Sequence, residues 1–268
     1  HNIGYIHAEY AFYDSLNQWS DAGKLYWPWG DEYDTPQPIR VCYPNVQLKD
    51  RKLFICGVSD IVEPYDEWRE YKKELTGKEW DYDFRRLFFT WTDDITKGKF
   101  HTWIEISSRD KTAGWIMPND MLVDDDGTVH LLWTERAIDE RLKEKFFPAE
   151  KQTNSLNYVQ IKNGVIRLRK AIYVGGEGEQ PGLSNGGRLH RTTNGATLIV
   201  YQLNEDACGG KPQMRVQEVS SDGRLGPYSA IHLGEPFTRF FSNTIRGGSA
   251  ASDSIHMLGA LSGKVKYV

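Results

Sequence analysis

The chain has 268 residues, 39% of them hydrophobic and 13% aromatic, which is enough for one substantial core in a single domain, 1–268. The formal net charge is −4, and lysine and arginine are scattered among the acids, so a nucleic-acid partner is not expected. No apolar run approaches the roughly 20 residues that span a bilayer, so no membrane partner is expected. Localisation stays undetermined, with a slight preference for a secreted or periplasmic protein.

Two kinds of hairpin alternate along the chain. One kind opens it over 4–27 and returns from Leu87, Ser155 and Gln213, with the apolar and polar alternation of strands that have one solvent face. The other kind ends in a strongly apolar strand. It covers 43–60 and returns from Met117, Ser184 and Ile245. In this second kind, Asp126-Gly127 and Asn194-Gly195 predict primed two-residue turns.

One buried hairpin plus one more exposed hairpin, repeated every 60 to 75 residues or so, is typical of a blade of four antiparallel strands. The sequence therefore predicts an all-β protein, a β-propeller with about four blades. The first hairpin of each blade would be nearest the axis.

Both chain ends offer the third strand of a blade, because the final GKVKYV resembles the start of the strand in NSLNYVQI. The ring either closes with four blades or is a piece of a larger ring, commonly of five to eight blades. We prefer the larger ring, which predicts self-association through open blade edges.

Two insertions separate the second and third strands of their blades, at 60–86 and 135–154. Their centres, EWREYKKEL and AIDERLKEKFF, predict short surface helices with charged pairs four residues apart. In a four-stranded meander these connections share one end with the residues that lead into each first strand. That end is the expected binding face.

Cysteine pairing is not expected within the first hairpin. A turn at Asp50-Arg51 places Cys56 opposite Asn45 and not opposite Cys42, so we expect small buried thiols.

The candidate site residues gather at the expected binding face. Tyr43, His190, Asp120 and Glu135 are the candidate acid, base or nucleophilic groups. The candidate substrate-binding residues are Asn45, Asn119, Arg188, Arg246, Arg85, Arg86 and Trp29, the last as part of a stacking platform with Trp27 and Tyr33. Strand alternation puts Arg188 and His190 on one strand face, and Gly186 and Gly187 would leave room for a ligand.

Other polar residues are assigned structural roles. His130 and His256 align with Phe54 and Leu198 in the repeats, which indicates packing positions. The run Asp124 to Asp126 lies in a turn at the opposite end, where solvated carboxylates are common. No metal site and no cofactor are expected.

The hairpin from Asp124 to Trp133, with its D-x-D-G-x-x-H pattern followed by two hydrophobic residues and Trp, resembles the BNR-repeat, sialidase-like propellers of a divergent bacterial branch. The resemblance implies a glycan-active enzyme that hydrolyses or eliminates at an acidic sugar in the axial funnel. Arginines would bind the substrate carboxylate, and an acid/base pair would do the chemistry. The alternative is a non-catalytic carbohydrate- or protein-binding propeller, because this fold hosts both.

Overall fold

The computed structural model describes residues 6–178, 182–204, 212–235, 237, 239–242, 250–261 and 264–268, without the side chains of 21, 22, 184 and 185. The chain divides into two compact units, which we call unit 1 (1–116 with 138–150) and unit 2 (117–137 with 151–268). No helix in the described ranges is long and apolar enough to cross a membrane.

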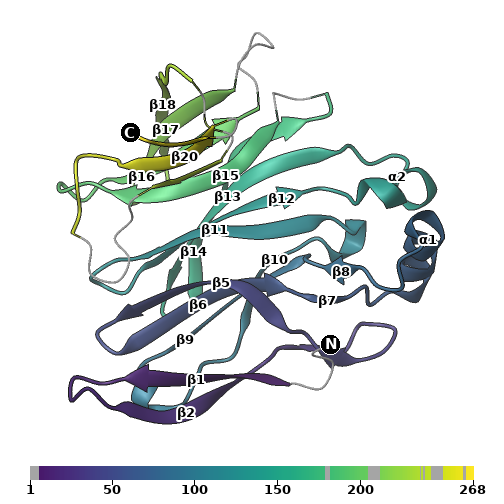
Figure 1. Ribbon diagram of the computed structural model, residues 1–268, viewed down its shortest axis with the longest axis horizontal. Helices are drawn as coiled ribbons and strands as arrows, with labels where there is room; N and C mark the ends of the chain where they lie inside the picture. Colours follow the sequence, from purple (N-terminus) through teal and green to yellow (C-terminus); the bar gives the residue numbers. More distant parts are fainter. Residues whose placement is uncertain are drawn as a thin grey trace. The chain divides into compact units, whose positions relative to one another are not determined.

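Unit 1 is built on a four-stranded antiparallel sheet of order β10-β9-β6-β5, together with a separate hairpin β1-β2 (Figure 1). The strands of that sheet are β5 (Val41–Lys49), β6 (Lys52–Ser59), β9 (Arg86–Thr92) and β10 (Ile104–Ser108), and the hairpin is β1 (His7–Tyr13) and β2 (Trp19–Tyr26). Short strand pairs are β3 (Trp29–Gly30) with β4 (Gln37–Pro38), and β7 (Ile61–Val62) with β8 (Tyr82–Asp83). The helices are α1 (Asp66–Thr76), α2 (Glu140–Phe146) and the 3₁₀ turns η1 (Ile95–Lys97) and η2 (Asp110–Thr112).

Unit 2 contains two further four-stranded sheets and one sheet of three strands. The first is β11 (Trp115–Val123), β12 (Val129–Arg136), β13 (Thr153–Lys162) and β14 (Val165–Gly176), in chain order. The second is β15 (Leu183–Arg191), β16 (Thr197–Leu203), β17 (Gln213–Val219) and β18 (Leu225–Ile231). The third is β19 (Arg239–Ser242), β20 (Met257–Leu261) and β21 (Lys264–Tyr267). Leu132, Leu156 and Leu189 belong to the apolar core between strands of the first two sheets.

The predicted hairpins and their grouping into four-stranded antiparallel sheets are confirmed three times, and the chain is mostly β. A closed ring is not established, so the propeller, the single domain and the open blade edges stay predictions. The fourth inner hairpin was expected from Ile245, but 243–249 lie outside the described residues. Among the described residues, β20 pairs instead with the earlier strand β19, and the expected last strand is β21.

Turn chemistry separates a confirmed prediction from a wrong one. Asp50 and Arg51 both have positive φ, at 48° and 68°, as a primed two-residue turn requires, and Asn45 pairs with Cys56. Cys42 and Cys56 are free thiols, as expected, and Cys208 lies outside the described residues. In the turns at Asp126-Gly127 and Asn194-Gly195 only the glycines have positive φ, so the expected primed turns are wrong. Each is a longer turn that ends in one left-handed glycine.

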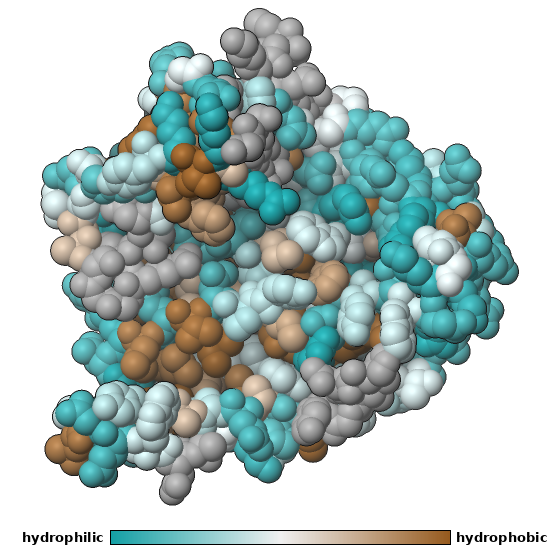
Figure 2. Space-filling model, viewed as in Figure 1, coloured by the Kyte–Doolittle hydropathy of each residue, from teal (hydrophilic) through white to brown (hydrophobic). Residues whose placement is uncertain are grey.

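Both predicted helices form, and they contact each other within unit 1 (Figure 1). Asp66 and Glu67 lie in the first turn of α1, where the helix dipole favours acids, and Gly77 ends the helix with φ 69°. The ring of Trp68 meets that of Phe147 with centroids 5.6 Å apart. The surface over the two helices is largely hydrophilic (Figure 2), as their charged sequences predict.

Candidate functional site

Three connections of unit 1 bring polar side chains together at the ends of its strands. Glu32 and Tyr33 lie between β3 and β4, Arg85 and Arg86 follow β8, and Asp110 begins η2 directly after β10. This agrees with the meander argument, which put the long insertion and the connections to the next first strand at one end. We call Asp110, Arg85, Arg86, Tyr33 and Tyr65 the Asp110 site.

The backbone around the two arginines is fixed by Ser59, the last residue of β6. Its buried hydroxyl accepts hydrogen bonds from the backbone N–H groups of Arg85, at 2.9 Å, and Arg86, at 3.1 Å. The side chain of Arg85 is buried together with that of Asp83, two residues earlier, because alternate residues of an extended segment share a face. Ser59 thereby fixes the backbone positions from which the Arg85 and Arg86 side chains extend.

Beneath the Asp110 site lies a buried charge network. Glu63, fully buried, accepts a hydrogen bond from Lys72 at 2.5 Å and another from Arg85. Lys72 is only 3% exposed and lies 3.5 Å from Asp139, which caps α2. Buried ionic groups need such partners, because a buried charge without a partner lowers the free energy of unfolding by roughly 3–5 kcal/mol. The network thus joins the 60–86 insertion to α2.

Asp110 and Asp83 are two carboxyl groups whose pKa is raised well above its ordinary value. Arg85 lies 3.3 Å from Asp83 and 3.8 Å from Asp110, and Arg86 lies 3.9 Å from Asp110. Burial nevertheless outweighs the guanidinium charges, raising the pKa of Asp110 to about 6 and that of Asp83 to about 7. Asp83 is 1% exposed, whereas the Asp110 side chain keeps 13% exposure. Of the two, Asp110 is the one that a ligand can reach.

Two phenols lie around Asp110 and stay protonated. Burial, followed by the nearby charge of Asp110, raises the pKa of Tyr65 to about 12 and that of Tyr33 further. Arg86 donates to the Tyr33 hydroxyl at 3.3 Å, and the Tyr33 and Tyr65 rings meet edge to face at 5.6 Å. The site therefore combines one protonatable carboxyl group, two cations and neutral phenols.

Two exposed tyrosines, Tyr43 and Tyr82, contact Phe84, the residue before Arg85. Tyr43 is 57% exposed and its ring contacts that of Phe84 at 5.6 Å, while Tyr82 stacks on Phe84 at 6.4 Å. Tyr43 has φ 49°, a backbone conformation that is rare for a bulky residue. It lies in a bulge of β5, where the pairing register with β6 shifts between Cys42 and Asn45. Of the expected platform, Trp29 is 51% exposed, Tyr33 is buried, and Trp27 packs against the core cluster that contains Tyr33 and lies 6.5 Å from Trp103. The stacking role of Trp29 stays a prediction.

Within unit 2 the structure brings together Asn119, Asp120 and Arg188. The Arg188 guanidinium donates to the Asn119 carbonyl and lies 4.9 Å from the Phe241 ring centroid. Burial lowers the pKa of Arg188. Asp120 accepts the backbone N–H of Leu189 at 2.9 Å, so this carboxylate links β11 to β15. Among the described residues there is no salt bridge between Asp120 and Arg188.

The prediction that Gly186 and Gly187 leave room for a ligand is wrong. A Cβ at Gly186, where φ is 72°, would lie 2.5 Å from the Asn119 side chain. A Cβ at Gly187 would lie 2.9 Å from Leu132. These glycines let β15 pack closely against its neighbours instead.

Glu135 and His190, the two other predicted catalytic residues of unit 2, are buried and have polar partners of their own. Glu135 is 6% exposed and accepts the Trp133 indole N–H at 2.6 Å, and His190 is 2% exposed with its Nε2 2.6 Å from the Ser252 carbonyl oxygen. Arg246 lies outside the described residues. The catalytic roles of all these residues stay predictions.

Sequence reasoning did not find Asp110, Asp83 or the polar contacts of His130. Asp110 stands between Arg109 and Lys111 without a motif, and its neighbours come from distant connections. His130 is buried, as expected of a packing position, yet both ring nitrogens have polar partners, Asp124 at 2.9 Å and Tyr158 at 2.5 Å. No cluster of the described residues is arranged to hold a metal ion.

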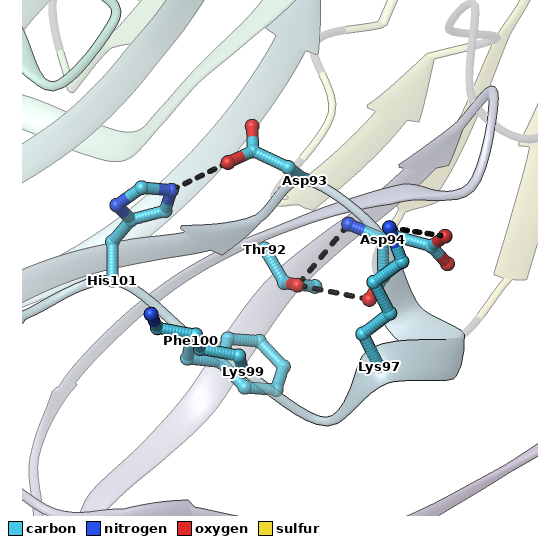
Figure 3. A pocket seen from close by; sticks show the side chains of 7 residues that line it. All are labelled: Thr92, Asp93, Asp94, Lys97, Lys99, Phe100 and His101. Atoms are coloured by element: carbon cyan, nitrogen blue, oxygen red, sulfur yellow. Dashed lines mark hydrogen bonds and ion pairs between the residues drawn. The ribbon is translucent and has the colours of Figure 1, made fainter.

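A shallow cavity of about 440 Å³ also lies at the turn between β9 and β10 (Figure 3). Figure 3 shows His101 directed toward Asp93, at 2.8 Å, and Thr92 bonded to Asp94. Lys97 is 77% exposed and Asp94 is already paired with Arg51 at 2.8 Å. These residues bond within the turn, so we assign the cavity no function.

No protein-family model matches the chain, and no curated protein matches it. Among solved structures the chain is similar to Zg3597, a family 117 glycoside hydrolase produced by the marine bacterium Zobellia galactanivorans, with 15% identity and a TM-score of 0.43. The alignment covers 86% of this chain, which spans 66% of the length of that protein. At this TM-score we draw no argument about activity from the similarity, and membership of the sialidase-like propellers stays a prediction.

Proposed function

We propose that the chain is a glycan-active enzyme that hydrolyses a glycosidic bond with Asp110 as the proton donor. The observation that carries the proposal is a carboxyl group with 13% side-chain exposure between two guanidinium groups, with its pKa raised to about 6. A general acid works best when its pKa is near the working pH. An ordinary exposed aspartate would be almost fully ionised there.

The second carboxylate of the proposed reaction is one of the two glutamates that are paired with Arg86. Arg86 is paired with Glu105 at 2.5 Å and with Glu32, and both of these glutamate side chains are partly exposed. Glycoside hydrolysis uses two carboxyl groups, one to protonate the leaving oxygen and one to activate water or attack the sugar. In our proposal Asp110 has the first role and Glu105 or Glu32 the second.

Recognition of a sugar is supported by aromatic side chains and by the resemblance of the 124–133 hairpin. The exposed rings of Tyr43 and Tyr82 offer apolar faces on which a sugar could stack. Recognition of an acidic sugar at this site has less support. Arg85 and Arg86 are already surrounded by five carboxylates of the chain, which are Glu63, Asp83, Asp110, Glu32 and Glu105. We therefore propose a neutral sugar ring at the Asp110 site.

Among the arginines predicted to bind a substrate carboxylate, Arg188 has no carboxylate partner within the described part of the chain. A desolvated guanidinium without a counter-charge is a fitting partner for an anion. If the substrate is acidic, Arg188 is our candidate for its anionic group.

The test is the pH dependence of hydrolysis over a panel of neutral and acidic oligosaccharides. We expect kcat/KM to fall as the pH rises through about 6, because the acid form of Asp110 is lost. Asp110→Asn should lower activity by about 10²-fold or more. Asp50→Asn, in an exposed turn where asparagine is equally suited, is the matched control. Saturable glycan binding without turnover would instead favour the non-catalytic alternative and contradict the proposal.

A further inference from the structure

Unit 2 contains an open cavity of about 540 Å³ lined by the turns β11-β12, β15-β16 and β17-β18 and by strand β13. This is within the size range of small-molecule sites. The side chains that matter for recognition are Asp124, His130, Gln160, Arg191, Thr197 and Glu218. His130, Gln160 and Thr197 are each less than one-tenth exposed, so the wall of the cavity is polar where most of the interior is apolar.

Hydrogen bonds fix the orientation of His130 in this wall. Gln160 donates its amide N–H to the Tyr158 hydroxyl at 3.0 Å, and this hydroxyl lies 2.5 Å from Nδ1 of His130. The other ring nitrogen, Nε2, lies 2.9 Å from Asp124 and 3.5 Å from the Arg191 guanidinium. Polar partners on both ring nitrogens thereby hold the imidazole ring in one orientation.

Arg191 completes the wall. It donates to the second oxygen of Asp124 and, at 2.7 Å, to the Gly195 carbonyl. Asp124 is therefore held by one group from β12 and one from β15, and its charge is balanced by Arg191. A wall fixed in this way loses little side-chain entropy when a ligand binds.

Two wall groups keep unused hydrogen-bonding capacity. Among the described residues, neither the Thr197 hydroxyl nor the Glu218 carboxylate has a hydrogen-bond partner. Glu218 also leaves the cavity with an excess of negative charge, since Asp126 is paired with Lys162 at 2.7 Å. The cavity thus offers donors and acceptors side by side and disfavours anions.

We propose that this cavity binds a small polyhydroxylated ligand without negative charge, such as a neutral sugar unit. Each sugar hydroxyl both donates and accepts, which matches a wall of mixed amide, hydroxyl, guanidinium and carboxylate groups. The site shares no residue with the Asp110 site, so it is an additional binding site and does not depend on the proposed hydrolysis.

The test uses a site-resolved signal, the ¹⁵N resonances of the His130 ring and the Gln160 side-chain amide. We expect methyl β-galactopyranoside to shift both saturably. Galacturonate has the same ring and a carboxylate, and it should need a roughly tenfold higher concentration for the same shift. One repulsive contact between like charges is enough to weaken binding by about tenfold.

Ser221→Trp should remove the shift by filling the cavity, since Ser221 is an exposed residue of its lining. Ser229→Trp, at an exposed serine of β18 outside the lining, is the matched control and should keep the shift. Three results would each overturn the proposal: no shift with galactoside up to about 100 mM, where a millimolar site would be saturated; galacturonate binding as well as galactoside; or an unchanged shift in Ser221→Trp.

Discussion

Asp83 makes the stability of the protein depend on pH in an unusual direction, and Asp83→Asn should remove that dependence. The Asp83 carboxyl group is 1% exposed, and burial raises its pKa from 3.8 to about 7. As the pH rises from 4 to 7, the unfolded chain releases this proton before the folded chain does. Stability from this group is therefore fully present below about pH 4 and is lost as the pH rises through 7.

The size of the effect follows from the shift. Roughly three pKa units at about 1.4 kcal/mol each give about 4 kcal/mol between pH 4 and pH 8. The free energy of unfolding of Asp83→Asn, minus that of the wild type, should rise by about this amount over the same range. Asp110 shifts in the same direction but is present in both proteins, so most of its effect cancels.

The assay is urea denaturation followed by tryptophan fluorescence at each pH unit from 4 to 8. Asp50→Asn, an exposed turn variant, should show no such slope. If the difference between Asp83→Asn and the wild type stays constant within about 1 kcal/mol, or falls with pH, the reasoning about the buried carboxyl group is refuted.

Three other substitutions test separate parts of the structure. Lys72→Met should lower the free energy of unfolding by about 3 kcal/mol or more, because it leaves Glu63 buried without one of its two cations; a loss below about 1 kcal/mol in chemical denaturation would contradict the buried network. Gly186→Ala should cost about 2 kcal/mol or more from the left-handed backbone and the contact with Asn119, measured in the same way, and a neutral result would mean that β15 packs less closely there. Arg188→Ala should weaken binding of an acidic sugar such as glucuronate by about one to two orders of magnitude in calorimetry; a lowered melting temperature with unchanged affinity per folded molecule would show a purely structural role.

The sequence predicted local structure correctly where residues close together in the chain determine it, through alternation of apolar and polar residues or through the turn at Asp50-Arg51. Alternation within each hairpin predicts the sheets, and counting from the turn at Asp50-Arg51 predicts the pairing of Asn45 with Cys56. The charged centres of the two insertions likewise predict α1 and α2. The predictions of primed turns at Asp126-Gly127 and Asn194-Gly195 were wrong because a glycine with positive φ also suits a longer turn.

The candidate site was only partly predictable. Arg85 and Arg86 were found because an insertion ends there. Glu63 and Asp83 belong to the same insertion, but Glu32, Glu105 and Asp110 come from other parts of the chain, and no local pattern encodes such meetings. Asp110 has an ordinary local sequence, and its pKa is unusual because burial outweighs the charges of Arg85 and Arg86. Alignment of the repeats correctly indicated that His130 is buried but was wrong for His256, which is exposed. It could not show the contacts of His130 with Asp124 and Tyr158.

The proton-donor role of Asp110 is tested most directly by comparing substrates with good and poor leaving groups. The dinitrophenolate of a 2,4-dinitrophenyl glycoside is a leaving group that departs without protonation. The leaving oxygen of a natural oligosaccharide needs a proton from the acid. We predict that Asp110→Asn loses about 10²-fold or more of kcat/KM on the oligosaccharide but stays within about tenfold of the wild type on the dinitrophenyl glycoside of the same sugar. Equal losses on both substrates, or no loss on the oligosaccharide, would contradict the account.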